Sequence, residues 1–168
     1  MTWFTNCLLF RVGYWQGTAD SAYGFENPYR DVFKNCTFYG GWVEFAHLED
    51  SPYWEVLIKN CAFDGTTLNL YPTGSGMSWL TSDYNVTNTL TYGDELLPGG
   101  HNRAPAGGSY NWQTSWFGDF YLPSNSICTN NGSITADLVG LYHFTTQTNQ
   151  LKETNSIVDI GYHYVATD

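Results

Sequence analysis

One short motif occurs three times in the sequence, and this repeat limits the folds that the chain can adopt. The motif is an Asn-Cys pair with an apolar residue two positions before the Asn, and it stands in Phe4–Phe10, Phe33–Gly40 and Ile58–Gly65. The Asn residues lie 29 and then 25 positions apart. A repeat of about 20 to 30 residues is typical of a solenoid. The sequence therefore predicts a parallel β-solenoid with three short strands and three turns in each coil.

Apolar residues alternate within each copy of the motif, as half-buried strands require. We expect three stacks of inward side chains: Phe4 with Phe33 and Ile58, Cys7 with Cys36 and Cys61, and Leu9 with Phe38 and Phe63. The Asn before each Cys breaks the alternation. Because Asn tolerates a left-handed backbone, it favours a bend between strands, where stacked amides can bond to one another as a ladder.

Further strands are predicted between and after the motifs, at Trp42–Ala46, Trp54–Ile58, Thr67–Tyr71 and, as one more strand or coil, Trp79–Val86. Gly17–Tyr29 is expected to form a protruding loop. The repeat fades after Thr73. We expect one all-β domain in which residues 1–86 form about three to four coils and residues 87–168 form a loop-rich C-terminal coil and an irregular cap.

Four cysteines are present, and the repeat places Cys7, Cys36 and Cys61 on one inward face, which favours free buried thiols. The sequence leaves the state of Cys128 open. It contains no Cys-x-x-C or His-x-x-x-His spacing, so we expect no metal site and no cofactor. His143 and His163 are interpreted as structural residues.

Composition excludes several classes of protein. The net charge is −10, with 6 Lys and Arg against 16 Asp and Glu, so no nucleic-acid partner is expected. Aromatic residues make up 18% of the chain, which argues against disorder. Because no run of about 18 apolar residues occurs, no membrane span is expected either.

The Asn-Cys-x-Phe-x-Gly units at Asn35–Gly40 and Asn60–Gly65 resemble the right-handed parallel β-helix proteins, also described as pectin-lyase-like. Ser126–Ser133, Asp137–Gly140 and Val158–Tyr164 resemble the end of the β-helix in large secreted or surface-attached bacterial proteins. The resemblance implies a right-handed parallel β-helix and a secreted or cell-surface location. Family members include polysaccharide lyases, glycoside hydrolases, adhesins and modules without known activity.

The sequence departs from the catalytic members of that family. It has neither the adjacent Asp pair nor the Gly-His-Gly segment of polygalacturonase-like sites, and no acid pair recurs on one face of the repeat. No amphipathic helix precedes the first coil. An uncovered coil leaves strand edges unpaired. We therefore expect either a C-terminal fragment of a longer solenoid or self-association through the uncovered N-terminal coil.

Acidic and aromatic residues are densest between positions 42 and 55. An aromatic ring beside a carboxylate is a common arrangement for holding a sugar. The carbohydrate-binding candidates are Trp42, His47, Asp50, Tyr53 and Trp54. Hydrolysis needs two carboxylates across the scissile bond. For that role we consider Glu44 with Glu55, and also with Glu49 or Asp50. The plain alternative is that all are solvated surface residues of an acidic protein.

The preferred interpretation is an extracellular β-helix module that binds carbohydrate, with polysaccharide as the partner, or makes surface contacts without a catalytic set. One alternative is a polysaccharide-active glycoside hydrolase or lyase that uses acids on the solenoid face. Another is a purely structural piece of a larger surface protein. Two further predictions concern residues outside the coils. Asp159 is expected to cap a turn. A bunch of aromatic residues is expected to form a satellite core, with a ligand platform as the alternative: Trp112, Trp116, Phe117, Phe120 and Tyr121.

Overall fold

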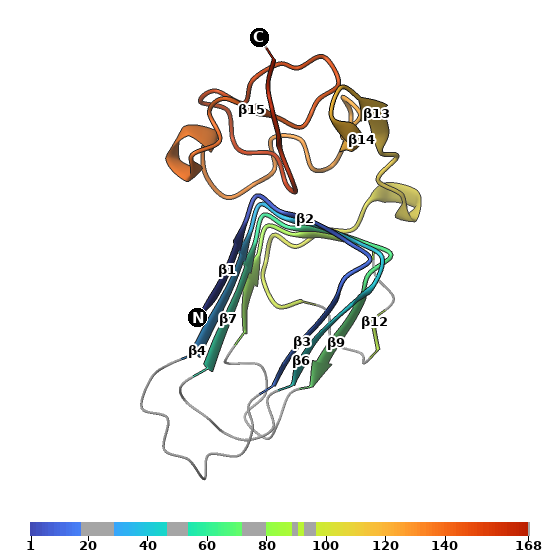
Figure 1. Cartoon of the computed structure of the whole chain (residues 1–168), viewed down its shortest axis with the longest axis vertical. Helices are drawn as coiled ribbons and strands as arrows, with labels where there is room; N and C mark the ends of the chain where they lie inside the picture. Colours follow the sequence, from blue (N-terminus) through green and yellow to red (C-terminus); the bar gives the residue numbers. More distant parts are fainter. Residues whose placement is uncertain (18–28, 47–53, 72–79, 89–90, 93–96, 168) are drawn as a thin grey trace.

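A computed structural model describes residues 1–17, 29–46, 54–71, 80–88, 91–92 and 97–167. The chain is all-β, and its first twelve strands form three parallel sheets (Figure 1). Sheet A contains β1 (Thr2–Thr5), β4 (Tyr29–Lys34), β7 (Trp54–Lys59) and β10 (Leu80–Asp83). Sheet B contains β2 (Leu8–Phe10), β5 (Thr37–Tyr39), β8 (Ala62–Asp64) and β11 (Val86–Asn88). Sheet C contains β3 (Gly13–Gly17), β6 (Trp42–Ala46), β9 (Thr67–Tyr71) and β12 (Thr91–Tyr92).

The chain passes through sheets A, B and C in the same order four times, and we call each passage a coil. The first coil is β1–β3, the second β4–β6, the third β7–β9 and the fourth β10–β12. Each strand pairs in parallel with the corresponding strand of the next coil. This topology is compatible with a β-helix, and it confirms the prediction of an all-β chain with stacked parallel strands.

The core lies between the three sheets and includes the predicted stacks, together with inward residues of sheet C such as Phe45 and Leu68. Phe4 pairs with Phe33 and Phe33 with Ile58, while Leu9, Phe38 and Phe63 align in sheet B. The rings of Phe38 and Phe63 stack with centroids 4.6 Å apart. All four cysteines are free; Cys36, Cys61 and Cys128 are buried and Cys7 is half-buried. The prediction of free thiols is therefore confirmed for all three cysteines of the repeat, and the prediction that they are buried is correct for Cys36 and Cys61 but not for Cys7.

The repeated Asn residues make the bend between sheets A and B. Asn6, Asn35 and Asn60 have φ values of 51°, 51° and 55°, which is the left-handed conformation expected for them. Part of the predicted ladder forms, because the amide nitrogen of Asn60 donates to the side-chain oxygen of Asn35 at 3.0 Å. Asn6 instead exchanges two hydrogen bonds with the backbone of His163.

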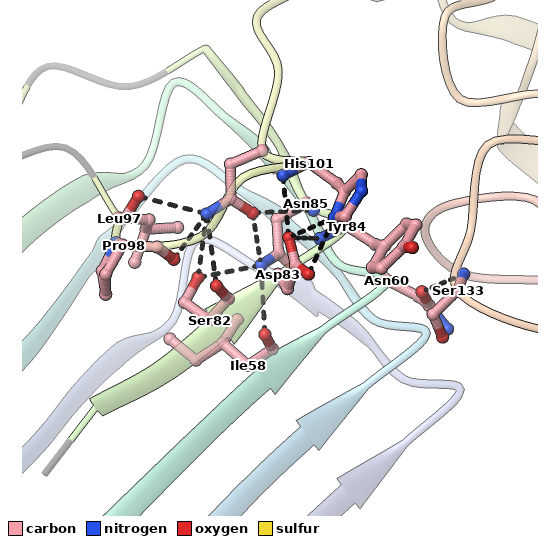
Figure 2. Close-up of polar contacts among 11 residues, drawn as sticks. Ile58, Asn60, Ser82, Asp83, Tyr84, Asn85, Leu97, Pro98, His101 and Ser133 are labelled. Atoms are coloured by element: carbon pink, nitrogen blue, oxygen red, sulfur yellow. Dashed lines mark hydrogen bonds and ion pairs between the residues drawn. The ribbon is translucent and has the colours of Figure 1, made fainter.

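The fourth coil carries a polar group where the other coils carry Cys. Tyr84 occupies the left-handed position, with φ of 57°, and the register then places Asn85 level with Cys61. Asn85 is fully buried, and its side chain donates to the carbonyl of Ile58 and to Ser82 (Figure 2). It also accepts the backbone amide of Cys61. A buried amide at an inward position is tolerable only because its bonds are made.

Residues 97–103 cover this end of the core. Asn102 bonds to Asn85, to Ser82 and to the carbonyls of Leu97 and Pro98 (Figure 2). Leu97 is buried in the core, and Arg103 forms a parallel bridge with Val86. The chain thus closes its own fourth coil with a polar plug around Asn102.

The C-terminal part packs on the outer face of sheet B and lies beyond that sheet in Figure 1. It contains the antiparallel pairs β13 (Gln113–Ser115) with β14 (Gly118–Tyr121) and β15 (Phe144–Thr145) with β16 (Tyr164–Val165). Two 3₁₀ turns, η2 (Ala106–Gly108) and η3 (Ala136–Val139), complete it. Buried Tyr110 contacts sheet B through its hydroxyl, which accepts the amide of Phe63 and lies within hydrogen-bond distance of the carbonyls of Val86 and Phe63.

One segment of this part crosses three coils. The Gly161 amide donates to the carbonyl of Asn60, the Tyr162 amide to the hydroxyl of Thr37, and the His163 amide to Asn6. Residues 161–163 therefore bind the third, second and first coils in turn. This docking fastens the bend of the first coil to the C-terminal part.

The predicted satellite core is correct only in part. Tyr121 and Phe120 are buried and Trp112 packs against them. Trp116 and Phe117, at the turn between β13 and β14, are 74% and 57% exposed. The prediction of a satellite core was therefore wrong for Trp116 and Phe117, because side chains at the turn between these two strands are exposed to solvent. Among the residues that the structure describes, no helix has the length and apolarity to cross a membrane.

Candidate functional site

The outer face of sheet C carries two of the residues predicted to bind sugar or act on it. Val43 and Phe45 are buried in the core. Since side chains alternate along a strand, Trp42 and Glu44 point outward from β6. Trp42 is 43% exposed and Glu44 is partly exposed. The alternation read from the sequence therefore gave the correct face for both residues.

Register builds two rows of side chains across this face. Trp15, Glu44 and Asn69 form one row, and Gly13, Trp42 and Thr67 form the other. The Asn69 amide nitrogen donates to a carboxylate oxygen of Glu44 at 3.2 Å. We call Trp15, Trp42, Glu44 and Asn69 the sheet C surface. It offers two aromatic rings, one carboxylate and one amide on a rigid support.

Gly13 leaves room for the Trp42 ring. A Cβ atom at position 13 would lie 2.8 to 2.9 Å from three atoms of the indole, well inside van der Waals contact. The indole therefore lies against the backbone of β3, held close to the sheet. This contact needs a Gly in the first coil at the same level as a Trp in the second coil. The sequence alone does not show this, because the register between the coils must be known first.

The two acids considered for catalysis lie on different sheets. Glu44 is on sheet C with Asn69, while Glu55 is on sheet A, where its carboxylate is 3.4 Å from Nε of Arg30. The side chain of Glu55 is 63% exposed and that of Arg30 is 43% exposed. The structure does not bring Glu44 and Glu55 together as a pair. Of the other candidates, Trp54 begins β7, and His47, Asp50 and Tyr53, with Glu49, lie outside the described residues.

A His-Asp contact that sequence analysis did not single out stands beside the polar plug (Figure 2). Nδ1 of His101 is 2.9 Å from a carboxylate oxygen of Asp83, whose other oxygen accepts the amides of His101 and Tyr84. Burial acts to raise the pKa of Asp83, but the hydrogen bonds from His101 and Tyr84 outweigh it and hold that pKa below its ordinary value. The His101 ring also stacks on Tyr84. These contacts fasten residues 97–103 to the fourth coil.

A second titratable cluster lies in the C-terminal part, at a cavity of about 270 Å³ lined by both Glu153 and Asp159. Asp159 accepts the amide of Asn130 at 2.6 Å and the hydroxyl of Thr146. Burial and the neighbouring Glu153 raise the pKa of Asp159 to about 6. Nε2 of the fully buried His163 is 3.4 Å from the carboxylate of Glu153. Because both oxygens of Asp159 are occupied, it ties three loops together, as a turn-capping residue does.

Asp31 is an unusual inward residue that sequence analysis also missed. It is buried at 3% exposure in sheet A, level with Val56. The signal was present, because Asp31 stands two residues before the inward Phe33 and so shares its face. Burial, and then the charge of Asp31, raise the pKa of Tyr14 to about 12. Among the described residues no group of three His, Cys, Asp or Glu side chains has the arrangement of a metal site.

Comparison with protein-family models, with curated proteins and with solved structures finds no match for this chain. Statements about its function therefore depend on its own residues. On the sheet C surface, aromatic rings lie beside a carboxylate, which is the arrangement that the sequence predicted for binding a sugar.

Proposed function

We propose that this chain is a module of the right-handed parallel β-helix type, from a secreted or cell-surface protein, that binds carbohydrate on its sheet C surface. The observation that carries the proposal is the Trp42 indole lying against Gly13, next to the row of Trp15, Glu44 and Asn69. A flat ring covers the apolar face of a sugar, while carboxylate and amide groups accept and donate hydrogen bonds to its hydroxyls.

Binding fits these residues better than catalysis does. Hydrolysis of a glycosidic bond needs two carboxyl groups roughly 5 to 10 Å apart around one bond. Glu44 and Glu55 stand on different sheets, each with its own partner. The polysaccharide-active alternative would need a second acid close to Glu44. A purely structural module is the remaining alternative, and it predicts no affinity for any glycan.

The proposal is tested by binding of the full chain to a panel of soluble polysaccharides, followed by titration calorimetry with those that bind. Trp42→Ala and Trp15→Ala should each weaken binding about tenfold or more, since an aromatic contact is lost from the centre of the surface. Trp116→Ala is the matched control, because Trp116 is 74% exposed but lies outside sheet C. Absence of binding across the panel, or an equal loss in the control, would refute the proposal.

A further inference from the structure

One carboxylate carries the only charge on the strands of sheet C. Of the residues in β3, β6, β9 and β12, Glu44 alone is acidic or basic. Its side chain points outward from β6 and is partly exposed. Oε2 of Glu44 accepts the neutral amide of Asn69 at 3.2 Å, and no described residue donates to Oε1. Within the described residues, the negative charge of Glu44 therefore has no cation beside it.

The cationic side chains of the chain lie on other parts of the fold. Arg11, at the bend before β3, extends over the Phe10 ring of sheet B, with its guanidinium carbon 5.3 Å from the ring centroid. The remaining Lys and Arg residues stand on sheet A or within residues 97–168: Arg30, Lys34, Lys59, Arg103 and Lys152. Since the whole chain has a net charge of −10, its overall field adds to the attraction that Glu44 exerts on a cation.

Two indole rings border this carboxylate. Trp15 pairs with Glu44 in the register of β3 and β6, so the two residues are direct neighbours on adjacent strands, with backbones about 4.8 Å apart. The Trp42 ring lies over Gly13, two residues from Trp15 on the same face. Both indoles are exposed. A positive charge over the face of an aromatic ring is attracted by it, most strongly when the ring is that of Trp. A cation at Glu44 can therefore contact aromatic rings as well as the carboxylate.

The chemistry of the sheet C surface favours a positively charged donor and disfavours an anion. An ammonium group supplies three N–H donors and accepts no hydrogen bond, which suits a carboxylate with one oxygen that no described residue occupies. A uronic acid or a sulfated sugar would instead place a second anion against Glu44, and like charges in contact are unfavourable. A neutral sugar would leave the charge of Glu44 without a counter-charge. Among sugars, an amino sugar therefore fits this surface best.

We propose that the sheet C surface binds glycans built from amino sugars, with a protonated amine at Glu44 and sugar rings against Trp15 and Trp42. This inference rests on the proposed function and narrows it to glycans that carry free ammonium groups. The carboxylate neutralises the ammonium group, and the indoles contact both the cation and the apolar face of the sugar ring. A lysine-rich peptide shares the ammonium group but has no flat apolar face, so a glycan is the occupant that both features favour.

Matched ligands separate the contribution of charge from that of the sugar ring. The full chain is titrated calorimetrically, at low salt and slightly acidic pH, with a β-linked glucosamine oligosaccharide and with its fully N-acetylated counterpart. A uronic acid oligosaccharide and a lysine oligopeptide of the same length complete the set. The glucosamine ligand should bind about tenfold or more tightly than each of the other three. Raising the ionic strength should reduce this preference, because salt screens the contact with an exposed carboxylate.

Glu44→Gln keeps an oxygen for the amide of Asn69 but removes the charge, so the glucosamine ligand should bind it no more tightly than the N-acetylated one. Asp137→Asn removes one charge from an exposed position on η3 and, as the matched control, should retain the preference.

Equal or tighter binding of any other ligand of the set, or a preference that persists in Glu44→Gln, would overturn the inference. The proposed function would still stand if Trp15→Ala weakens binding of the oligosaccharides. No binding of the glucosamine ligand would also overturn the inference, and the wider polysaccharide panel then decides the proposed function separately.

Discussion

The buried carboxylate of Asp159 predicts an unusual dependence of stability on pH. Its pKa is about 6 in the folded chain, against an ordinary value of 3.8, because burial and Glu153 penalise the charged form. A pKa raised by folding means that the folded state holds the proton more tightly than the unfolded state. Between pH 4 and 6 the native chain therefore binds more protons at this site, and the free energy of unfolding falls as pH rises.

The size of the effect follows from the shift. Two pKa units correspond to about 3 kcal/mol, since each unit is worth about 1.4 kcal/mol. Asp159 should thus contribute a loss of about 3 kcal/mol in unfolding free energy between pH 4 and pH 6, and no further change above that range. Such a loss is a large share of the stability of a domain, which is about 5 to 15 kcal/mol.

Urea unfolding of the wild type and of Asp159→Asn at pH values from 4 to 8 measures this contribution. The difference between the two proteins removes the background of the other acids. Asn keeps an oxygen for the amide of Asn130 and does not titrate. The wild type should therefore lose stability relative to the variant from pH 4 to 6. Asp137→Asn is the control, because Asp137 is exposed on η3. A constant difference across this range, or a difference of opposite sign, would refute the reasoning.

Three further substitutions test other parts of the structure. Asn85→Ala should destabilise the chain by about 3 kcal/mol or more in urea unfolding, because the buried Cys61 amide and Ile58 carbonyl lose their partner; unchanged stability would contradict the polar plug. Gly13→Ala should weaken polysaccharide binding by about 1 kcal/mol and change the fluorescence of Trp42, since the new Cβ displaces the indole; full affinity with unchanged fluorescence would contradict that contact. Asp31→Val should raise stability by about 1 to 3 kcal/mol and lower the pKa of Tyr14 in an ultraviolet titration; a loss of stability would show that the carboxylate is fully paired.

The coils were predictable because each strand obeys a local rule that its neighbours repeat. Alternation of apolar residues gave the bounds of β6 and β9 and the inward stacks of the first three coils. The rule fails at the fourth coil. If Asn85 is aligned with Asn60 because both are Asn, the register between the third and fourth coils is wrong by one residue. A shift of one residue turns every side chain of a strand to the other face of the sheet. In the structure Tyr84 takes the bend instead, and Asn85 moves to the core.

The C-terminal part was less predictable, since its contacts are distant in sequence. The hydrogen bonds between Asn6 and His163 join residues 157 positions apart, and no periodic pattern in the sequence predicts them. The sheet C surface was half predicted: alternation gave Trp42 and Glu44, but Trp15 and Asn69 join them only through register between coils. Asp83 and His101 meet because a loop folds back upon the fourth coil, which no local pattern encodes.

The repeated Asn has two physical roles, and together they explain why the bend is not Gly. A left-handed φ is easiest for Gly, and backbone geometry alone would favour it. Only Asn adds an amide at the bend that both donates and accepts. Asn60 donates to Asn35 and accepts from the amide of Ser133, while Asn6 donates to and accepts from the backbone of His163. The residue that turns the chain from sheet A to sheet B therefore also binds the C-terminal part. The repeat that identified the coils in the sequence thus marks the line along which the two halves of the chain are joined.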